Sequence, residues 1–187
     1  MFEFKKVSKE QYFKDCGYQH DDDEFFENKL TEEYNNIKLP KRATKFSAGY
    51  DFYMPFDYTL SPNEYAVIPT GIRWVDKLSE EYFIYTDTKK TGINGASVLL
   101  LYPRSGLGIK KGLRLRNTIG VVDSDYSLSD NEGHIMVALE NAGNTDIEIK
   151  QGDRIIQGIV QDVWFSPKYD KQFDITNRTG GFGSTGE

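Results

Sequence analysis

The sequence has little cysteine and histidine, and each shortage excludes a class of chemistry. Cys16 is the single cysteine among 187 residues, so no internal disulfide can form. His20 and His134 are its only histidines, and with one thiol they are too few to build a structural zinc site. Catalysis by a Ser-His or Cys-His triad has few candidate residues for the same reason. These shortages direct attention to carboxylates, arginines and glycine-rich segments.

Long apolar runs are also absent. No run is long enough to cross a bilayer, and the first residues, MFEFKKVSKEQYF, contain no apolar signal-peptide core. We therefore expect a cytoplasmic protein with no membrane contact. The chain has no excess of positive charge either, since 23 Lys and Arg against 29 Asp and Glu give a net charge of −6. This balance argues against non-specific binding to nucleic acid.

What is present is the composition of a folded protein. Hydrophobic residues make up 38% of the chain and charged residues 28%, and the length of 187 residues suits one sizeable core. The acids are concentrated at the start, where residues 1–35 hold ten of them against five lysines. We divide the chain into an acidic, partly helical N-terminal extension (1–36), a core (37–170) and a glycine-rich C-terminal arm (171–187).

Two stretches of the extension have features of helices. Ser8 followed by Gln11 forms a capping box before KEQYFKD, and Gly17 is a stop signal, which predicts a short helix. In HDDDEFFENKLTEEYNN, apolar side chains recur at helical spacing, so an amphipathic helix packed on a neighbour is one interpretation. We favour the other, a solvated acidic face, as the commoner outcome for such a cluster of charge.

From Ile37 onward, short runs rich in β-branched and aromatic residues alternate with turn signals. No helical period recurs between them, so the core is predicted to be all-β, a sandwich, jelly roll or small barrel, and doubly wound folds are excluded. The end of the chain loses strand character, which predicts a flexible arm. The expected strands are 65–68, 71–74, 82–86, 97–102, 134–139, 146–149 and 155–160.

Two segments of the core suggest an anion site. Ser47-Ala-Gly-Tyr-Asp-Phe-Tyr53 places the carboxylate of Asp51 in an apolar strand context, where it either serves a site or caps a turn. Pro103-Arg-Ser-Gly-Leu-Gly-Ile-Lys-Lys-Gly112 follows an apolar strand. Its guanidinium, hydroxyl and unhindered backbone N–H groups come from Arg104, Ser105 and Gly106, and suit phosphate oxygens. We favour this phosphate cradle over an ordinary basic turn.

A third segment, Asn117-Thr-Ile-Gly-Val-Val-Asp-Ser-Asp-Tyr126, holds the carboxylates Asp123 and Asp125. At positions i and i+2 of an extended chain they point the same way, and apolar neighbours keep Asp123 partly dry. Such a carboxylate can hold and deprotonate a water. Solvated acids in a hairpin turn are the alternative.

The fourth segment is the tail Arg178-Thr-Gly-Gly-Phe-Gly-Ser-Thr-Gly186. Its match to GxGxxG is not a dinucleotide site, because only Glu187 follows where a helix is needed. What remains is a strip that either closes over a base and a phosphate or stays disordered.

These four segments, in this order and with Gly152-Asp-Arg-Ile-Ile-Gln157 between the third and the tail, resemble the five motifs of the trimeric dUTPase family. The resemblance extends from about Leu39 to Gly186. It implies a β jelly-roll homotrimer with shared active sites at subunit interfaces, each closed by a C-terminal arm. It also implies Mg²⁺-dependent hydrolysis of dUTP to dUMP and pyrophosphate.

The resemblance implies a role for each motif residue. Asp51 would anchor Mg²⁺ through its water shell, and Asp123 would activate the attacking water. The remaining residues would bind substrate, with Arg104, Ser105, Gly106 and Gln157 on phosphate, Asn117 on uracil or water, the strand beside Val121, Val122 and Met136 on uracil, Tyr126 on deoxyribose, and Arg178, Phe182, Gly183, Ser184 and Thr185 closing the site from the arm.

The sequence departs from the family pattern in three places. Tyr126-Ser-Leu-Ser-Asp-Asn-Glu-Gly133 contains a short insertion near the expected sugar site, and a second insertion at 87–95 is expected to form an exposed hairpin. Arg178 lies one residue closer to the following glycine than is common.

Two other functions compete with this one. A dCTP deaminase has the same fold, but Ala138 stands where a deaminase has its catalytic Glu. A regulatory protein of this fold would bind a protein partner through the N-terminal extension or the hairpin near Lys89.

Overall fold

The computed structural model describes residues 2–19, 23–76, 95–165 and 172. Its helices are α1 (Lys9–Asp15), α2 (Glu24–Asn36), α4 (Ser105–Lys111) and the 3₁₀ helix η1 (Ser124–Leu128). Its strands are β1 (Phe2–Lys6), β2 (Lys41–Arg42), β3 (Tyr50–Tyr53), β4 (Tyr58–Leu60), β5 (Tyr65–Asp76), β6 (Gly95–Pro103), β7 (Leu113–Leu115), β8 (Gly120–Asp123), β9 (His134–Asn141), β10 (Ile147–Ile149) and β11 (Arg154–Trp164).

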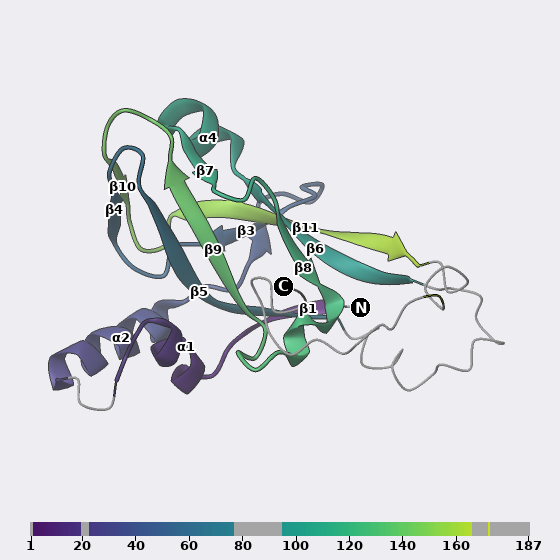
Figure 1. The fold of residues 1–187 in the computed structure, drawn as a ribbon, viewed down its shortest axis with the longest axis horizontal. Helices are drawn as coiled ribbons and strands as arrows, with labels where there is room; N and C mark the ends of the chain where they lie inside the picture. Colours follow the sequence, from purple (N-terminus) through teal and green to yellow (C-terminus); the bar gives the residue numbers. More distant parts are fainter. Residues whose placement is uncertain (1, 20–22, 77–94, 166–171, 173–187) are drawn as a thin grey trace.

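The strands pair antiparallel into three sheets (Figure 1), ordered β1-β5-β9-β7, β2-β3-β11-β6-β8 and β10-β4. Side chains of the two larger sheets pack into one core, with Phe52, Leu99, Ile135 and Ile156 almost fully buried. The all-β prediction is therefore confirmed. The expected strand at 82–86, most of the hairpin at 87–95 and the motif residues of the arm lie outside the described residues.

Strand β5 joins the two runs that the sequence separated at 65–68 and 71–74. Its pairing with β9 is irregular between Pro69 and Arg73. Gly71 lies in this irregular stretch with φ of +72°, and a Cβ there would collide with Ile37 at the end of α2. Only glycine combines this backbone with this close approach.

The N-terminal extension begins with a strand that the sequence analysis missed. β1 pairs with β5 from Phe2 opposite Asp76 to Lys6 opposite Ile72. The ring of Phe4 packs edge-on against Phe52 of β3 at 5.5 Å between centroids. The start of the chain is thus an integral edge of the core.

Helix α1 forms where it was predicted, but its capping box is incomplete, because the Gln11 side chain bonds Asp15 and Glu132 accepts from the Ser8 N–H. The Ser8 hydroxyl accepts a hydrogen bond from the backbone N–H of Gln11 at 3.1 Å and caps the helix. Cys16 is the C-cap, and Gly17 after it has φ of +83°. Burial raises the pKa of the Cys16 thiol to about 12.

The preference for a solvated face in the next stretch is wrong, because a packed helix forms. Asp23 caps α2 through Phe26 N–H at 2.8 Å, and Leu30 is buried in the core with Phe26 and Tyr34 packed beside it. The acids Glu24, Glu27 and Glu32 are exposed, whereas Glu33 is buried. The apolar spacing therefore predicted this helix better than its charge did. No helix in the described ranges is long and apolar enough to span a membrane.

Candidate active site

The carboxylate of Asp51 is the centre of a cluster of charged groups on the larger sheet. Asp51 lies within β3, and its side chain is 9% exposed. Its Oδ1 is 3.0 Å from Nε of Arg104, and its Oδ2 is 3.2 Å from Nη1 of Arg154. A carboxylate this buried needs such partners to remain charged. The alternative role, capping a turn, does not apply because Asp51 is inside a strand.

Gln157 adds an amide to this cluster. It lies directly opposite Asp51 on β11, and its Nε2 donates to the carbonyl of Pro103 at 3.3 Å. A Cβ at Gly49 would lie 2.7 Å from Gln157 Oε1, so the glycine leaves room for this side chain. Three of the predicted motifs thus meet in one place. Burial raises the pKa of the neighbouring Tyr53, and the charge of Asp51 adds to the rise.

The expected phosphate loop is a short helix. Gly112 ends α4 with φ of +74°, a backbone that suits glycine at a helix end. Lys110 and Lys111 lie in the last turn, where their positive charge stabilises the helix. Ser105 and Gly106 are exposed in the first turn, where backbone N–H groups have no partner within a helix. Among the described residues, no atom outside the glycine, its two neighbours and the nearby helix backbone lies within 4 Å of a Cβ built on Gly106. These donors remain accessible to an anion beside Arg104.

The third motif forms a second cluster around β8. This strand is an edge of the larger sheet within the described residues, so its outer backbone groups are available for pairing. Val122 is buried and Val121 is 62% exposed, because neighbouring strand residues face opposite sides. Asn117 is exposed before the strand, and Asp123 is half-buried at its end. Asp125 lies in η1, so the prediction that both carboxylates share one extended segment is wrong.

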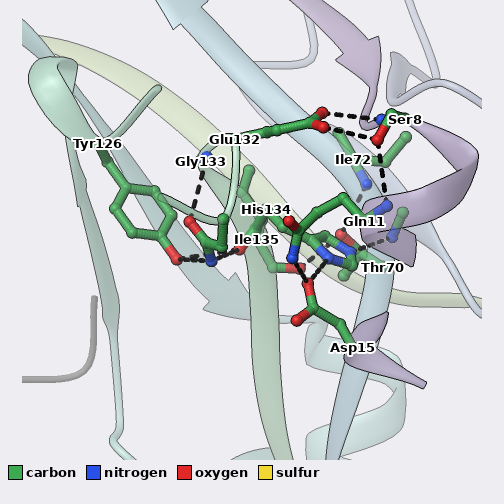
Figure 2. Close-up of polar contacts among 12 residues, drawn as sticks. Ser8, Gln11, Asp15, Thr70, Ile72, Tyr126, Glu132, Gly133, His134 and Ile135 are labelled. Carbon is green, nitrogen blue, oxygen red and sulfur yellow. Dashed lines mark hydrogen bonds and ion pairs between the residues drawn. The ribbon is translucent and has the colours of Figure 1, made fainter. Parts of the chain in front are cut away.

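Tyr126 of η1 is buried, and its hydroxyl is fixed by two hydrogen bonds. It donates to the carbonyl of His134 at 3.0 Å and accepts from Nδ2 of Asn131 at 2.9 Å (Figure 2). Met136 lies on β9 of the other large sheet. Sheet membership alone therefore does not bring Met136 beside Val121.

The two clusters are far apart within one chain. Asp51 of β3 lies opposite Gln157 of β11, which lies opposite Tyr102 of β6. Asp123 of β8 lies opposite Val98, four residues from Tyr102 on the same strand β6. The two carboxylates are therefore three strands apart across the sheet and four residues apart along it. At ~4.8 Å per strand and ~3.3 Å per residue, this separates them by roughly 20 Å. One chain does not bring all the predicted residues together.

The sequence analysis did not identify Arg154, although this residue lies in the same motif as Gln157, residues 152–157. A buried carboxylate in an apolar strand requires a cation, which is a signal to look for an arginine but does not say which one; Arg154 reaches Asp51 only through the pairing of β11 with β3. Within the described residues, no three His, Cys, Asp or Glu side chains form a metal-binding group. Arg178, Phe182, Gly183, Ser184 and Thr185 lie outside those residues.

Comparison with known proteins identifies the family. The family model for dUTPase matches residues 35–186. The chain belongs to the dUTPase family. The deoxyuridine 5'-triphosphate nucleotidohydrolase of Lactococcus lactis is 36% identical over 151 residues, which are 80% of this chain and 89% of that protein. The predicted enzyme class, a nucleotidohydrolase, is that of the family.

Solved structures agree with this assignment. The dUTPase of Streptococcus mutans is 26% identical with a TM-score of 0.59, covering 87% of this chain and 97% of that one. This similarity confirms the dUTPase-like jelly roll. A mutant dUTPase from phage phi11 of Staphylococcus aureus, described with a structural Mg(II) ion, is 18% identical with a TM-score of 0.57, covering 89% of this chain and 93% of that one. At this identity it supports the fold alone.

Proposed function

We propose that this chain hydrolyses dUTP to dUMP and pyrophosphate with Mg²⁺. The observation that carries the proposal is the meeting of Asp51, Arg104 and Gln157, three motif residues from distant parts of the sequence, in one cluster. Attack on a polyanionic triphosphate requires neutralised charge, a positioned water and exclusion of solvent. The residues below meet the first two requirements, and the arm residues Arg178, Phe182, Gly183, Ser184 and Thr185 are proposed to meet the third.

The Asp51 cluster binds the triphosphate. Arg104 is a bidentate donor for phosphate oxygens, and the α4 residues Ser105 and Gly106 add a hydroxyl and backbone N–H groups. Gln157 contributes an amide N–H. When nucleotide binds, Arg104 must exchange part of its contact with Asp51 for phosphate.

The carboxylate of Asp51 suits Mg²⁺ that is bound through its water shell rather than directly. Oδ2 of Asp51 accepts a hydrogen bond from Arg154, and Oδ1 forms an ion pair with Arg104, but a carboxylate has about four acceptor positions in all. The free positions can bind waters of a hydrated ion, and Mg²⁺ commonly keeps its waters and takes its other ligands from substrate phosphates. The ion, when bound, offsets the charge of the triphosphate.

The β8 cluster provides the water and the specificity. Asp123 at the end of β8 orients and deprotonates the attacking water. The exposed edge of β8 beside Val121 and Val122 reads the polar edge of uracil, with Asn117 and Met136 bordering that site. Tyr126 fills the space that a ribose 2′-hydroxyl would need.

A homotrimer with shared sites reconciles the two clusters. They are roughly 20 Å apart in one chain at the spacing of β-strands, so a single nucleotide reaches both only if a second copy supplies one of them. A symmetric assembly repeats such a shared site at each subunit interface.

Pyrophosphate release from dUTP, dCTP, dTTP and UTP tests the proposal. We expect release from dUTP with Mg²⁺ to be far faster than from the other three, and little release after chelation of the metal. Turnover of dCTP equal to that of dUTP would end the proposal, and ammonia release from dCTP would favour a deaminase instead. Ala138, which stands where a deaminase has its catalytic Glu, lies three residues before Asn141, and the Asn141 amide at the end of β9 donates to the carbonyls of Leu60 and Thr145.

A further inference from the structure

Hydrogen bonds connect helix α1 to the segment that carries Tyr126 (Figure 2). This segment, residues 124–133, contains η1 and the short insertion of this sequence, and we call it the rim loop. Helix α1 precedes the part of the chain that matches the family, residues 35–186. Two features outside the common dUTPase pattern therefore contact each other.

Glu132 makes the first connection. Its carboxylate accepts from the backbone N–H of Ser8 at 2.8 Å and from the Ser8 hydroxyl at 2.6 Å. The same hydroxyl caps α1, so one side chain joins the helix start to the rim loop. Glu132 has φ of +59°, a backbone that non-glycine residues hold only where contacts enforce it. Burial favours the neutral acid, but the bonds from Ser8 and the charge of Arg73 outweigh it and lower the pKa of Glu132.

His134 makes the second connection, directly after the rim loop. Its ring is fully buried, and Nε2 accepts from the backbone N–H of Gly71 at 2.7 Å. The ring proton is therefore on Nδ1, which donates to Oδ2 of Asp15 at 2.5 Å. Asp15 is the last residue of α1, so the start of this helix is joined to the rim loop through Glu132 and its end to the first residue of β9.

Both connections lead to Tyr126. The Tyr126 hydroxyl donates to the carbonyl of His134 and accepts from the side-chain amide of Asn131 in the rim loop. Arg73 of β5 donates from Nη2 to the carbonyl of Ser127, the residue after Tyr126, at 2.7 Å. A shift of the rim loop therefore moves the Tyr126 ring.

We propose that α1 positions Tyr126 for selection of the sugar, with Ser8 and Glu132 as positioning residues. The inference rests on the proposed function, in which the Tyr126 ring excludes a ribose. A wall rejects one hydroxyl only if it cannot retreat, and the contact between Ser8 and Glu132 prevents that retreat. Without this contact the rim loop relaxes and UTP gains access.

Steady-state kinetics on dUTP, UTP and dTTP test this role. Glu132→Asn removes the contact but keeps a residue that tolerates positive φ, and Ser8→Ala removes the hydroxyl from the other side. We expect the preference for dUTP over UTP to fall roughly tenfold in both variants, read as a ratio of kcat/KM values. Ser8→Thr retains the hydroxyl and should restore the preference. Asp130→Ala removes an exposed charge from the same loop and is the matched control.

The preference for dUTP over dTTP separates positioning from general damage. It should not change in any variant, because the base is read on β8. Unfolding lowers all three activities together and leaves both ratios unchanged. Without nucleotide, the amides of residues 124–133 should exchange hydrogen faster in Glu132→Asn than in Asp130→Ala.

The outcomes distinguish this inference from the proposed function. A wild type that does not hydrolyse dUTP overturns the proposed function and the selectivity role with it. An active wild type, together with Glu132→Asn and Ser8→Ala variants that keep wild-type dUTP activity and unchanged dUTP-to-UTP ratios, overturns the positioning role alone.

Discussion

At the residue scale, Asp123 is the side chain on which the proposed chemistry depends. It ends the edge strand β8 half-buried, at the boundary between apolar core and solvent. Asp123→Asn can still orient a water but accepts a proton poorly, so we expect kcat to fall by roughly 10² or more with little change in KM. Pre-steady-state and steady-state assays with dUTP measure both. Asp125→Asn, two residues away in η1, is the control for loss of a negative charge. A near-normal kcat in Asp123→Asn would remove this carboxylate from the mechanism.

The buried imidazole of His134 makes the stability of the protein sensitive to pH. Burial lowers the pKa of His134, although Asp15 and Glu132 oppose the shift, so the folded chain binds a proton less readily than the unfolded chain, whose histidines titrate near 6.5. The unfolded state therefore gains protons first, and the free energy of unfolding falls as pH falls below about 6.5. Glu132 has a lowered pKa and acts with the same sign, below about pH 4.5.

Urea unfolding at several pH values tests this dependence. His134→Gln removes the titrating group, so its free energy of unfolding should fall less than that of the wild type between about pH 7 and pH 5. His20→Gln removes the other histidine and is the control for losing an imidazole as such. Parallel curves for the wild type and His134→Gln would show that His134 does not cause the slope.

At the element scale, β1 shows that the extension belongs to the core. Phe4 packs against Phe52 and Tyr50 with ring centroids 5.5 and 5.4 Å apart. Phe4→Ala should lower the free energy of unfolding by about 2–4 kcal/mol, since it removes a large ring from partly buried packing. Phe25→Ala, whose ring on α2 is 78% exposed, should change it by less than about 0.5 kcal/mol. Equal effects in chemical denaturation would mean that β1 is not packed in solution.

Elements with local signals could be predicted from the sequence. Ser8, Gln11 and Gly17 define α1 within ten residues, because capping depends on near neighbours. β1 could not be predicted in this way, since its pairing partner begins about sixty residues later in the chain. Helix α4 was not predicted, because Gly106 and Gly108 have low helix propensity and the segment was interpreted as a loop.

The site was predicted by residue type more completely than by geometry. Asp51, Arg104 and Gln157 were expected to act together, and strand pairing brings them together. Arg154 was missed because its contact with Asp51 depends on the register of β11 against β3, which includes an irregularity that no local pattern indicates. The contact between Glu132 and Ser8 joins residues 124 positions apart and had no signal at all.

At the scale of the whole molecule, the separation of the two clusters predicts complementation between inactive chains. Arg104→Ala damages one cluster and Asp123→Asn the other, so each homotrimer should be inactive. The two variants are co-expressed with different tags, so that mixed trimers form. In any mixed trimer, one of the three interfaces joins an intact Asp51 cluster to an intact β8 cluster. Mixed trimers should therefore recover roughly a third of wild-type activity. Tandem affinity purification followed by dUTP kinetics measures the recovery. Mixed trimers without activity would place each complete site within one chain.

The half-buried thiol of Cys16 has a practical consequence for spectroscopy. Its raised pKa keeps the thiol protonated at neutral pH, and the thiolate is the form that attacks maleimides and disulfide reagents. A cysteine introduced at an exposed position, such as Asp130→Cys, should therefore react much faster than Cys16. A fluorophore or spin label can then be attached at one chosen point of the rim loop while the native thiol stays in place.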